Sequence, residues 1–246
     1  MVSCLMGDST ALASAIVRCC LKTTANNIQP KNANRSWNLT TCPNDFYGIN
    51  ATWFNLTPSN DNSVLNIAMY NGSVVGSNNP NYCGEINDIG EHVIAYTSNS
   101  NNTLKYQHAL HLSEISGLGG GGSGSWAIGG AAISLGNSNW EENVGNTFSV
   151  LYLNNTTTAR TAIVANTNSN DIYLIVGKAT SGFYVSDFRT AIQQYLGISD
   201  TSSYDHTYYK GLFLDGGGSS ELVCDEVTCS GDGRTLTGVL LLRRNM

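Results

Sequence analysis

The sequence predicts an α+β fold in which mixed, largely antiparallel sheets surround one main core helix. From Phe46 onward, short strand-like segments alternate with turn signals such as Asn71-Gly72, a pattern typical of strands joined by tight turns. One longer segment, Ser186 to Leu196, has the apolar spacing of a helix. This helix lies between two predicted strands, so we also expect one β-α-β unit.

The predicted strands are short, and turn signals separate many of them. Gly211 to Leu214 is expected to be a buried strand with turn chemistry on both sides. A further apolar strand is expected near the C-terminus. The other segments are Val64 to Tyr70, His92 to Thr97, Leu104 to Leu112, Ala127 to Leu135, Phe148 to Leu153, Arg160 to Ala165 and Ile172 to Val176.

The predicted helix can be capped at both ends, by Ser186 at its start and by Gly197 after its end. With the strands before and after it, the helix forms the expected β-α-β crossover. That crossover would place Asp215 at the carboxyl end of a strand, where open sheets tend to bind ligands. The apolar face consists of Phe188, Ala191, Ile192, Tyr195 and Leu196.

The stretch Leu214 to Ser220, with sequence LDGGGSS, is the strongest candidate site. Three successive glycines can adopt φ > 0 and leave no side chains, so their N–H groups can converge on a ligand. Asp215 would stand beside an anion-sized concavity, with the Ser219 and Ser220 hydroxyls nearby. The alternative is a glycine-rich turn in which Asp215 caps its own backbone.

Composition excludes several classes of protein. Twelve Lys and Arg against 18 Asp and Glu give a net charge of −6, so no basic patch is available to bind duplex nucleic acid. The sequence has no apolar run of 18 residues, which excludes a membrane-spanning helix. Residues 117–122 satisfy G-x-G-x-x-G, but no helix pattern follows them, so we expect neither a dinucleotide site nor another cofactor.

The N-terminal region differs from the remainder in pattern. Residues 1–45 are interpreted as an appendage, formed by a short helix within Thr10 to Leu21 and then a polar, Asn-rich segment; residues 46–246 form the main domain. No positively charged stretch precedes the apolar residues, so the chain has no recognisable signal peptide. The Asn-, Ser-, Thr- and Gly-rich composition nevertheless suggests an extracellular or virion-associated protein.

Seven cysteines occur, without the spacing of a zinc site, so we expect no metal. Cys224 and Cys229 flank four residues, which suits a disulfide that closes a hairpin tip, and Cys42 with Cys83 is a plausible second bridge. The odd total leaves at least one thiol free or intermolecular. Buried reduced cysteines remain the alternative for all of them.

Four sequence blocks, in order, resemble the motifs of the phosphodiester glycosidase family. They are Gly48 to Phe54 (GINATWF), Trp126 to Ile133 (WAIGGAAI), Ala159 to Ile163 (ARTAI) and Asp215 to Ser219 (DGGGS), with Gly233-Arg234 close behind. The resemblance spans roughly Gly48 to Arg243. The chain departs from the family pattern at Ala51, Ala131, Ala132 and Ala159.

This resemblance implies a hydrolase that cleaves sugar-1-phosphodiesters or related phosphorylated glycans. Asp215 would act near the anomeric carbon, Arg160 would clamp the phosphate with Arg234 as a second cation, and Asn50 would position the substrate. A structural salt bridge is the alternative for Arg160, and a turn-forming role is the alternative for Asn50. The expected substrate-binding residues are Gly216, Gly217, Gly218, Ser219, Thr161 and Arg234.

In a second hypothesis the chain has the same fold but is not an enzyme. The same domain could be a glycan-binding or structural subunit of a virion or extracellular filament, with assembly into homo-oligomers or particles. The aromatic-rich segment Tyr204 to Tyr209 is interpreted as loop packing, with stacking on a sugar as the alternative.

Overall fold

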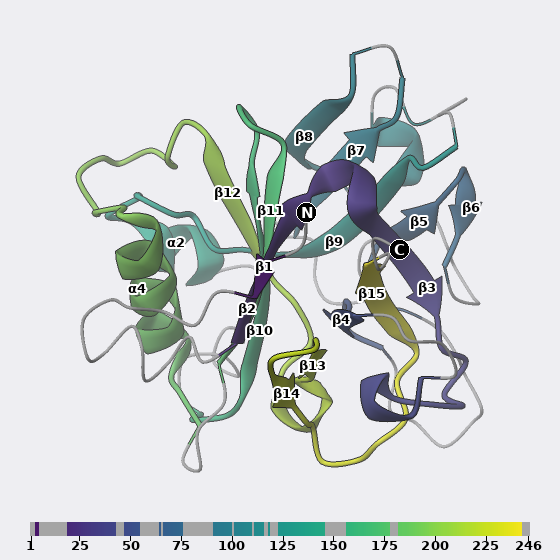
Figure 1. Cartoon of the computed structure of the whole chain (residues 1–246). Helices are drawn as coiled ribbons and strands as arrows, with labels where there is room; N and C mark the ends of the chain where they lie inside the picture. The colour runs from purple at the N-terminus through teal and green to yellow at the C-terminus, as the bar shows by residue number, and fades with distance from the viewer. Residues whose placement is uncertain are drawn as a thin grey trace.

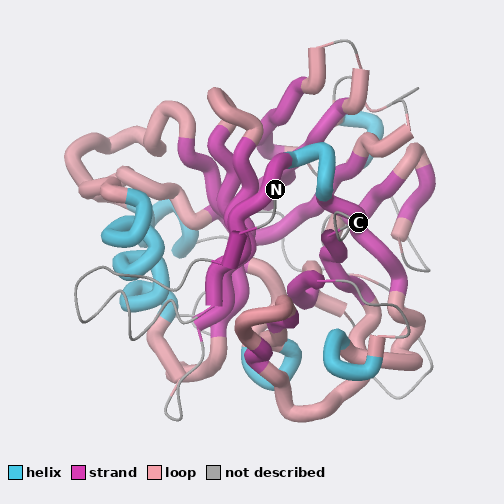
Figure 2. Tube along the Cα trace, in the orientation of Figure 1, coloured by secondary structure: helices cyan, strands magenta, loops and turns pink. Residues whose placement is uncertain are grey.

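The computed structural model contains two antiparallel sheets (Figure 1). It describes residues 3–4, 19–42, 47–54, 64, 66–75, 91–99, 101–109, 111–115, 118, 123–145, 156–177 and 182–242. Among these residues helices are few, and the longest packs against one face of the larger sheet (Figure 2). The predicted α+β class with largely antiparallel sheets is therefore confirmed.

The larger sheet has ten strands among the described residues, in the order β1-β2-β11-β10-β12-β9-β5-β6, with β7 pairing β9 and β8 pairing β7. Each paired neighbour is antiparallel. The strands are β1 (Ser3–Cys4), β2 (Cys19–Thr24), β5 (Ala68–Tyr70), β6 (Ser73–Val74), β7 (Glu91–Thr97), β8 (Thr103–His108), β9 (Trp126–Ala132), β10 (Arg160–Asn166), β11 (Asp171–Gly177) and β12 (Tyr209–Phe213).

The smaller sheet has five strands in the described residues, in the order β14-β13-β4-β15-β3. They are β3 (Ile28–Asn32), β4 (Tyr47–Asn50), β13 (Leu222–Val223), β14 (Thr228–Cys229) and β15 (Gly238–Leu242). The helices are α2 (Trp140–Gly145) and α4 (Val185–Leu196), with single 3₁₀ turns η1 (Ala25–Asn27), η2 (Leu39–Thr41), η3 (Leu112–Glu114) and η4 (Gly217–Ser219).

Strands β10 to β12 are buried on both faces, because the small sheet covers one face and α4 covers the other (Figure 1). The β-strand period of two divides their side chains accordingly. Ile163 of β10 packs in the core between the sheets, whereas Ala162 and Val164 pack with Phe188 of α4. The near-continuous apolar sequence of these strands follows from this double burial.

The predicted β-α-β unit is present in a split form. Strands β11 and β12 both pair antiparallel with β10, so they run parallel to each other with β10 between them. Helix α4 connects them and ends, as predicted, at Gly197, whose φ of 69° lets its N–H reach the last helical carbonyls. Its N-cap is Tyr184 rather than Ser186, and no side chain caps it.

Some local predictions were wrong. Cys19 to Leu21, expected at the end of a helix, form part of β2 and pair with β11, and the rest of that predicted helix lies outside the described residues. Strands β2 and β3 thus bring residues 19–32 of the expected appendage into both sheets. Strand β8 ends at His108, and the predicted strand Phe148 to Leu153 lies outside the described residues. In the part of the chain that is described, no helix has the length and apolarity to span a bilayer.

The disulfide pairing also differs from the prediction. Cys229 is bonded to Cys19, not to Cys224, although β13 and β14 do form the expected hairpin. Cys42 carries a free thiol, and its expected partner Cys83 lies outside the described residues. The Cys19–Cys229 bond joins β2 of the large sheet to β14 of the small sheet, a pairing that only the packing of the two sheets makes possible.

Candidate active site

The glycine turn after β12 is held by backbone hydrogen bonds to two other strands. Leu214 N–H donates to the Thr161 carbonyl (2.9 Å) and Gly217 N–H to the Ala159 carbonyl (2.8 Å), both on the β10 side. Asp215 N–H donates to the Ala51 carbonyl (3.2 Å), at the end of β4. Ala51 and Ala159, which depart from the family pattern, hold the turn through backbone carbonyls, so their changed side chains leave these contacts intact.

Asn50 ties the site together and has little capacity left for a substrate. Its Nδ2 donates to the Asp215 carbonyl (2.7 Å), while its Oδ1 accepts from the Thr161 hydroxyl (2.9 Å) and from Glu221 N–H (3.0 Å). Because an amide oxygen has two lone pairs, its acceptor sites are filled. The Thr161 and Ser220 hydroxyls lie 3.0 Å apart next to this amide. Asn50 and Thr161 therefore lie beside the Asp215 turn, and their polar atoms bind other groups of the protein.

The polar groups of the turn fall into two sets. The amides of Ser219 and Ser220 donate to carbonyls of the turn, and that of Gly217 donates to Ala159, directly before β10. The N–H of Gly217 is therefore not open to a ligand, although the sequence predicted that it would be. Within the described part of the chain, Gly218 N–H has no hydrogen-bond acceptor. The Ser219 Oγ likewise is buried without a partner of good geometry there. This hydroxyl lies close enough to the Asp215 carboxyl to lower its pKa, so it is directed to the same side of the turn as that carboxyl.

Asp215 stands at the edge of this turn with an altered ionisation. Burial raises the pKa of the Asp215 carboxyl from its ordinary 3.8 to about 6. The nearby Ser219 hydroxyl, the positive charge of Arg234 and the Gly216 N–H each oppose the shift without cancelling it. A carboxyl that changes charge near neutral pH, at the carboxyl end of a strand, has the properties of a catalytic base or nucleophile.

Arg234 reaches the glycine turn through a short loop that covers it. The Arg234 Nε lies 2.9 Å and 3.0 Å from the two carboxylate oxygens of Asp232, and Asp232 N–H donates to the Gly218 carbonyl (2.9 Å). A Cβ on Gly218 would collide with both side chains of this ion pair. Gly218 is therefore a glycine because the Asp232–Arg234 pair lies directly against its Cα. The pair keeps substantial exposure, so its guanidinium remains accessible from solvent.

The Arg160 side chain, which the sequence predicted to bind a phosphate, donates instead to backbone carbonyls of the protein. Its Nε donates to the Phe183 carbonyl (3.1 Å) and another guanidinium nitrogen to the Thr156 carbonyl (2.6 Å). Burial lowers the pKa of Arg160 to about 10. The backbone bonds of Thr161 and Ala159 to the turn place the Arg160 backbone beside it, but Arg234 is the cation whose charge acts on Asp215.

Sequence reasoning missed two acidic residues in this region. Asp232, two positions before the predicted Arg234, is the partner that orients it; the D-x-R spacing was the available signal. Glu221 is buried below the turn, where its carboxylate accepts from Leu39 N–H (2.9 Å). The residues around Glu221 gave no sign of the contact with Leu39, because Leu39 is 182 residues away in the sequence.

The amino-acid sequence matches no protein-family model and no curated protein sequence. The structure is similar to the catalytic domain of zebrafish N-acetylglucosamine-1-phosphodiester alpha-N-acetylglucosaminidase, solved in a form auto-inhibited by its pro-peptide. That similarity has a TM-score of 0.62 at 13% identity and covers 100% of this chain and 82% of the other. A hypothetical protein from Synechocystis matches with a TM-score of 0.49 at 16% identity, over 92% of this chain and 59% of the other. The chain thus shares the fold of the zebrafish catalytic domain.

Proposed function

We propose that this chain is a hydrolase that cleaves sugar-1-phosphodiesters or a related phosphorylated glycan linkage. The observation that carries the proposal is the Asp215 carboxyl, with a pKa of about 6, set beside an accessible guanidinium and the buried Ser219 hydroxyl. The fold it shares with a phosphodiester glycosidase domain supports the same reaction class. The disulfide supports an oxidising, extracellular setting.

The reaction requires two kinds of contact. The phosphodiester carries a negative charge that Arg234 can bind, with Gly218 N–H and the Ser219 hydroxyl as further donors to its oxygens. The anomeric carbon gains positive charge as its bond to the phosphate oxygen breaks, and ionised Asp215 would stabilise that charge, attack the carbon or activate a water molecule. The phosphate monoester leaves as an anion, so no acid need protonate it.

The remaining predicted residues take supporting roles in this proposal. Asn50 and Thr161 hold the Asp215 backbone in place, and Arg160 fixes the segment before β10 through its two carbonyl contacts. Arg234 replaces Arg160 as the principal phosphate ligand, because its pairing with Asp232 is at the surface and can be exchanged for a substrate.

Release of free sugar from UDP-N-acetylglucosamine and from a synthetic glycosyl phosphodiester tests the proposal. We expect Asp215→Asn to lower kcat/KM by roughly 10²-fold or more, since it removes the reacting carboxylate. Arg234→Ala should raise KM as well. Asp225→Asn, which changes an exposed aspartate of the β13–β14 hairpin, is the matched control and should keep wild-type activity.

Circular dichroism and thermal melting must show that each variant is folded. If wild type releases no sugar from any phosphodiester glycan, or if Asp215→Asn is as active as wild type, the hydrolase proposal is wrong. A folded protein that binds such a glycan without cleaving it would instead support the glycan-binding subunit.

A further inference from the structure

The loop between α4 and β12 exposes two tyrosines. Tyr204 has 78% of its surface exposed and Tyr208 49%; among the described residues, Tyr184 is the only other large hydrophobic side chain that is similarly exposed. The prediction that the Tyr204 to Tyr209 segment packs against the protein holds for Tyr209, which contacts the core under α4. It does not hold for Tyr204 and Tyr208, whose rings face solvent.

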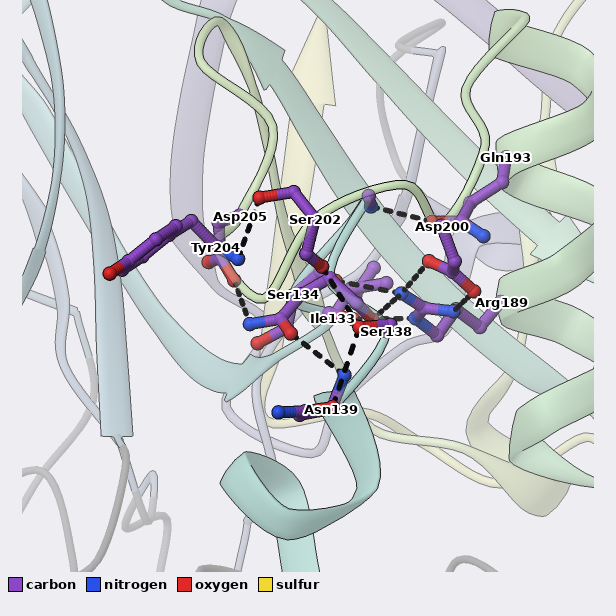
Figure 3. A network of polar contacts seen from close by, with 12 residues as sticks. Ile133, Ser134, Ser138, Asn139, Arg189, Gln193, Asp200, Ser202, Tyr204 and Asp205 are labelled. Carbon is purple, nitrogen blue, oxygen red and sulfur yellow. Dashed lines mark hydrogen bonds and ion pairs between the residues drawn. The ribbon is translucent and has the colours of Figure 1, made fainter.

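The loop is anchored at its start by Arg189 of α4. This side chain is 1% exposed and donates to the carbonyls of Ile133 (3.0 Å), Ser134 (2.8 Å) and Asn137 (2.9 Å). It also forms an ion pair with both carboxylate oxygens of Asp200 (2.8 and 2.7 Å) (Figure 3). One buried guanidinium therefore fixes the beginning of the loop to the turn that follows β9.

Further contacts fix the rest of the loop to that same turn. Ser138 N–H donates to the Ser202 carbonyl (2.7 Å), and Asn137 Nδ2 donates to Asp205 Oδ1 (3.2 Å). His206 N–H donates to the Leu135 carbonyl (2.6 Å). Figure 3 shows the Tyr204 ring extending away from this network rather than into it.

The far side of the loop is ordered by the His206 ring. Its Nδ1 accepts from the N–H groups of Tyr208 (3.2 Å) and Tyr209 (3.1 Å). The ring centroid lies 6.5 Å from that of Tyr208 and 5.3 Å from that of Tyr209. The loop backbone that carries the exposed rings is thus held in place before any ligand arrives, which lowers the entropic cost of binding.

The size of the exposed surface indicates the kind of ligand. A tyrosine offers 150–250 Å² when fully buried, so rings that are 78% and 49% exposed present on the order of 200–300 Å² together. A stable protein interface needs about 800 Å² from each partner. The aromatic surface is too small for that, but it matches one or two sugar rings.

The charge of the loop indicates which class of ligand it can bind. Residues 198–208 contain Asp200, Asp205 and His206 but no Lys or Arg, together with several Ser and Thr hydroxyls. The loop itself offers a phosphate or a nucleic acid no cation, and the nearby Lys210 is half-buried with its charge acting on Asp205. An uncharged sugar can stack its C–H face on an aromatic ring and hydrogen-bond to neighbouring hydroxyl and carboxylate groups.

We propose that Tyr204, His206 and Tyr208, the tyrosine loop, form a binding site for a neutral carbohydrate, separate from the Asp215 site. Strand β12 lies between the two sites. Seven residues from Tyr208 to Asp215 at about 3.3 Å each set them roughly 20 Å apart. The tyrosine loop would hold a distant part of a long glycan or a glycan-bearing surface, and it needs no catalysis at Asp215.

The test measures binding of four neutral trisaccharides, built from N-acetylglucosamine, α-glucose, β-glucose or mannose, by calorimetry and by NMR at millimolar sugar. We expect at least one to bind, and Tyr204→Ala and Tyr208→Ala each to weaken it by roughly ten-fold. Tyr204→Phe keeps the ring and should bind nearly as well. Tyr184→Ala, an exposed tyrosine outside the loop, is the matched control and should not change affinity.

Asp215→Asn separates this proposal from the proposed function. Trisaccharide binding that survives Asp215→Asn and is lost in Tyr204→Ala supports the tyrosine loop, whether or not the protein hydrolyses phosphodiesters. Binding that survives Tyr204→Ala, or the absence of binding by all four sugars, would overturn it. Concentration-dependent self-association that disappears in Tyr204→Ala would also overturn it, because the loop would then be a contact between copies. Both tyrosines are exposed, so unchanged thermal melting should accompany each variant.

Discussion

Asp215 illustrates how a reactive residue can weaken the fold that carries it. Its carboxyl has a pKa of about 6 in the folded chain against an ordinary 3.8, so the folded state binds the proton more tightly than the unfolded state. Ionisation therefore costs stability as pH rises from about 4 to 6, by about 3 kcal/mol once complete. The same burial keeps the carboxylate poorly solvated and hence reactive.

Asp215→Asn should consequently stabilise the protein while abolishing activity. At about pH 8 we expect a gain of about 1–3 kcal/mol in the free energy of unfolding, because the variant has no buried charge to accommodate. Near pH 4 the gain should vanish, since the wild-type carboxyl is then protonated when folded. Urea titrations at the two pH values measure the difference. A variant less stable than wild type at pH 8 would contradict the assigned cause of the shift.

The pH dependence of activity provides a second test of the ionisation of Asp215. If ionised Asp215 is the reactive form, kcat/KM should rise about ten-fold per pH unit below pH 6 and level off above about pH 7. Initial rates of sugar release over this range provide the measurement. A profile that instead falls above pH 6 would assign Asp215 the role of a proton donor.

At the level of elements, Arg189 connects α4 to the turn after β9. Its guanidinium satisfies three carbonyls and stacks over Trp140 at 4.8 Å, while its partner Asp200 remains partly exposed. A buried guanidinium with so many partners contributes far more than a surface pair, because its removal leaves buried acceptors unsatisfied. Helix docking and loop position thus depend on one side chain.

Arg189→Leu should lower the free energy of unfolding by about 3–5 kcal/mol, because the three carbonyls lose their donor. Asp200→Asn keeps those bonds and should cost about 1–2 kcal/mol. The contrasting control is Arg234→Ala, which breaks an exposed ion pair and should change stability by no more than about 1 kcal/mol. Denaturant titrations distinguish the three. Equal losses for Arg189→Leu and Arg234→Ala would show that the buried network contributes little.

For the whole molecule, the Cys19–Cys229 bond links the two sheets across 210 positions of the sequence. A crosslink that closes so long a loop restricts the unfolded chain strongly, and such bonds typically contribute about 2–5 kcal/mol. It also fixes β14, and with it the chain that leads to Asp232 and Arg234, to the large sheet. The covalent link therefore acts on the arrangement of the sheets around the glycine turn.

Cys229→Ser and Cys19→Ser should each lower the unfolding free energy by about 2–5 kcal/mol, and a reducing agent should do the same to wild type. Cys42→Ser, which removes a free thiol, is the control and should have little effect. Thermal melts with and without reductant give the comparison. The pairing would be disproved if Cys224→Ser, rather than Cys19→Ser, made the protein insensitive to reductant.

The sequence predicted those features of the site that depend on neighbouring residues. The apolar spacing of α4, the strand Tyr209–Phe213 and the glycine turn after it are local patterns, and the structure has each of them. The resemblance also placed Asn50, Thr161 and Arg234 near Asp215. Local spacing did not reveal that the Asn50 amide bonds to Thr161 or that Arg160 bonds to the Phe183 carbonyl, since these partners lie elsewhere in the chain.

The sequence by itself determined the strand-rich fold class, the main helix and the position of the glycine turn, because side-chain period and turn chemistry act over a few residues. Only the tertiary structure decided the partner of Cys229, the place of residues 19–24 in the large sheet and the contact of Asp232 and Arg234 with Gly218. Each of these depends on contacts between segments that are separate in the sequence, and such contacts leave no local pattern to read.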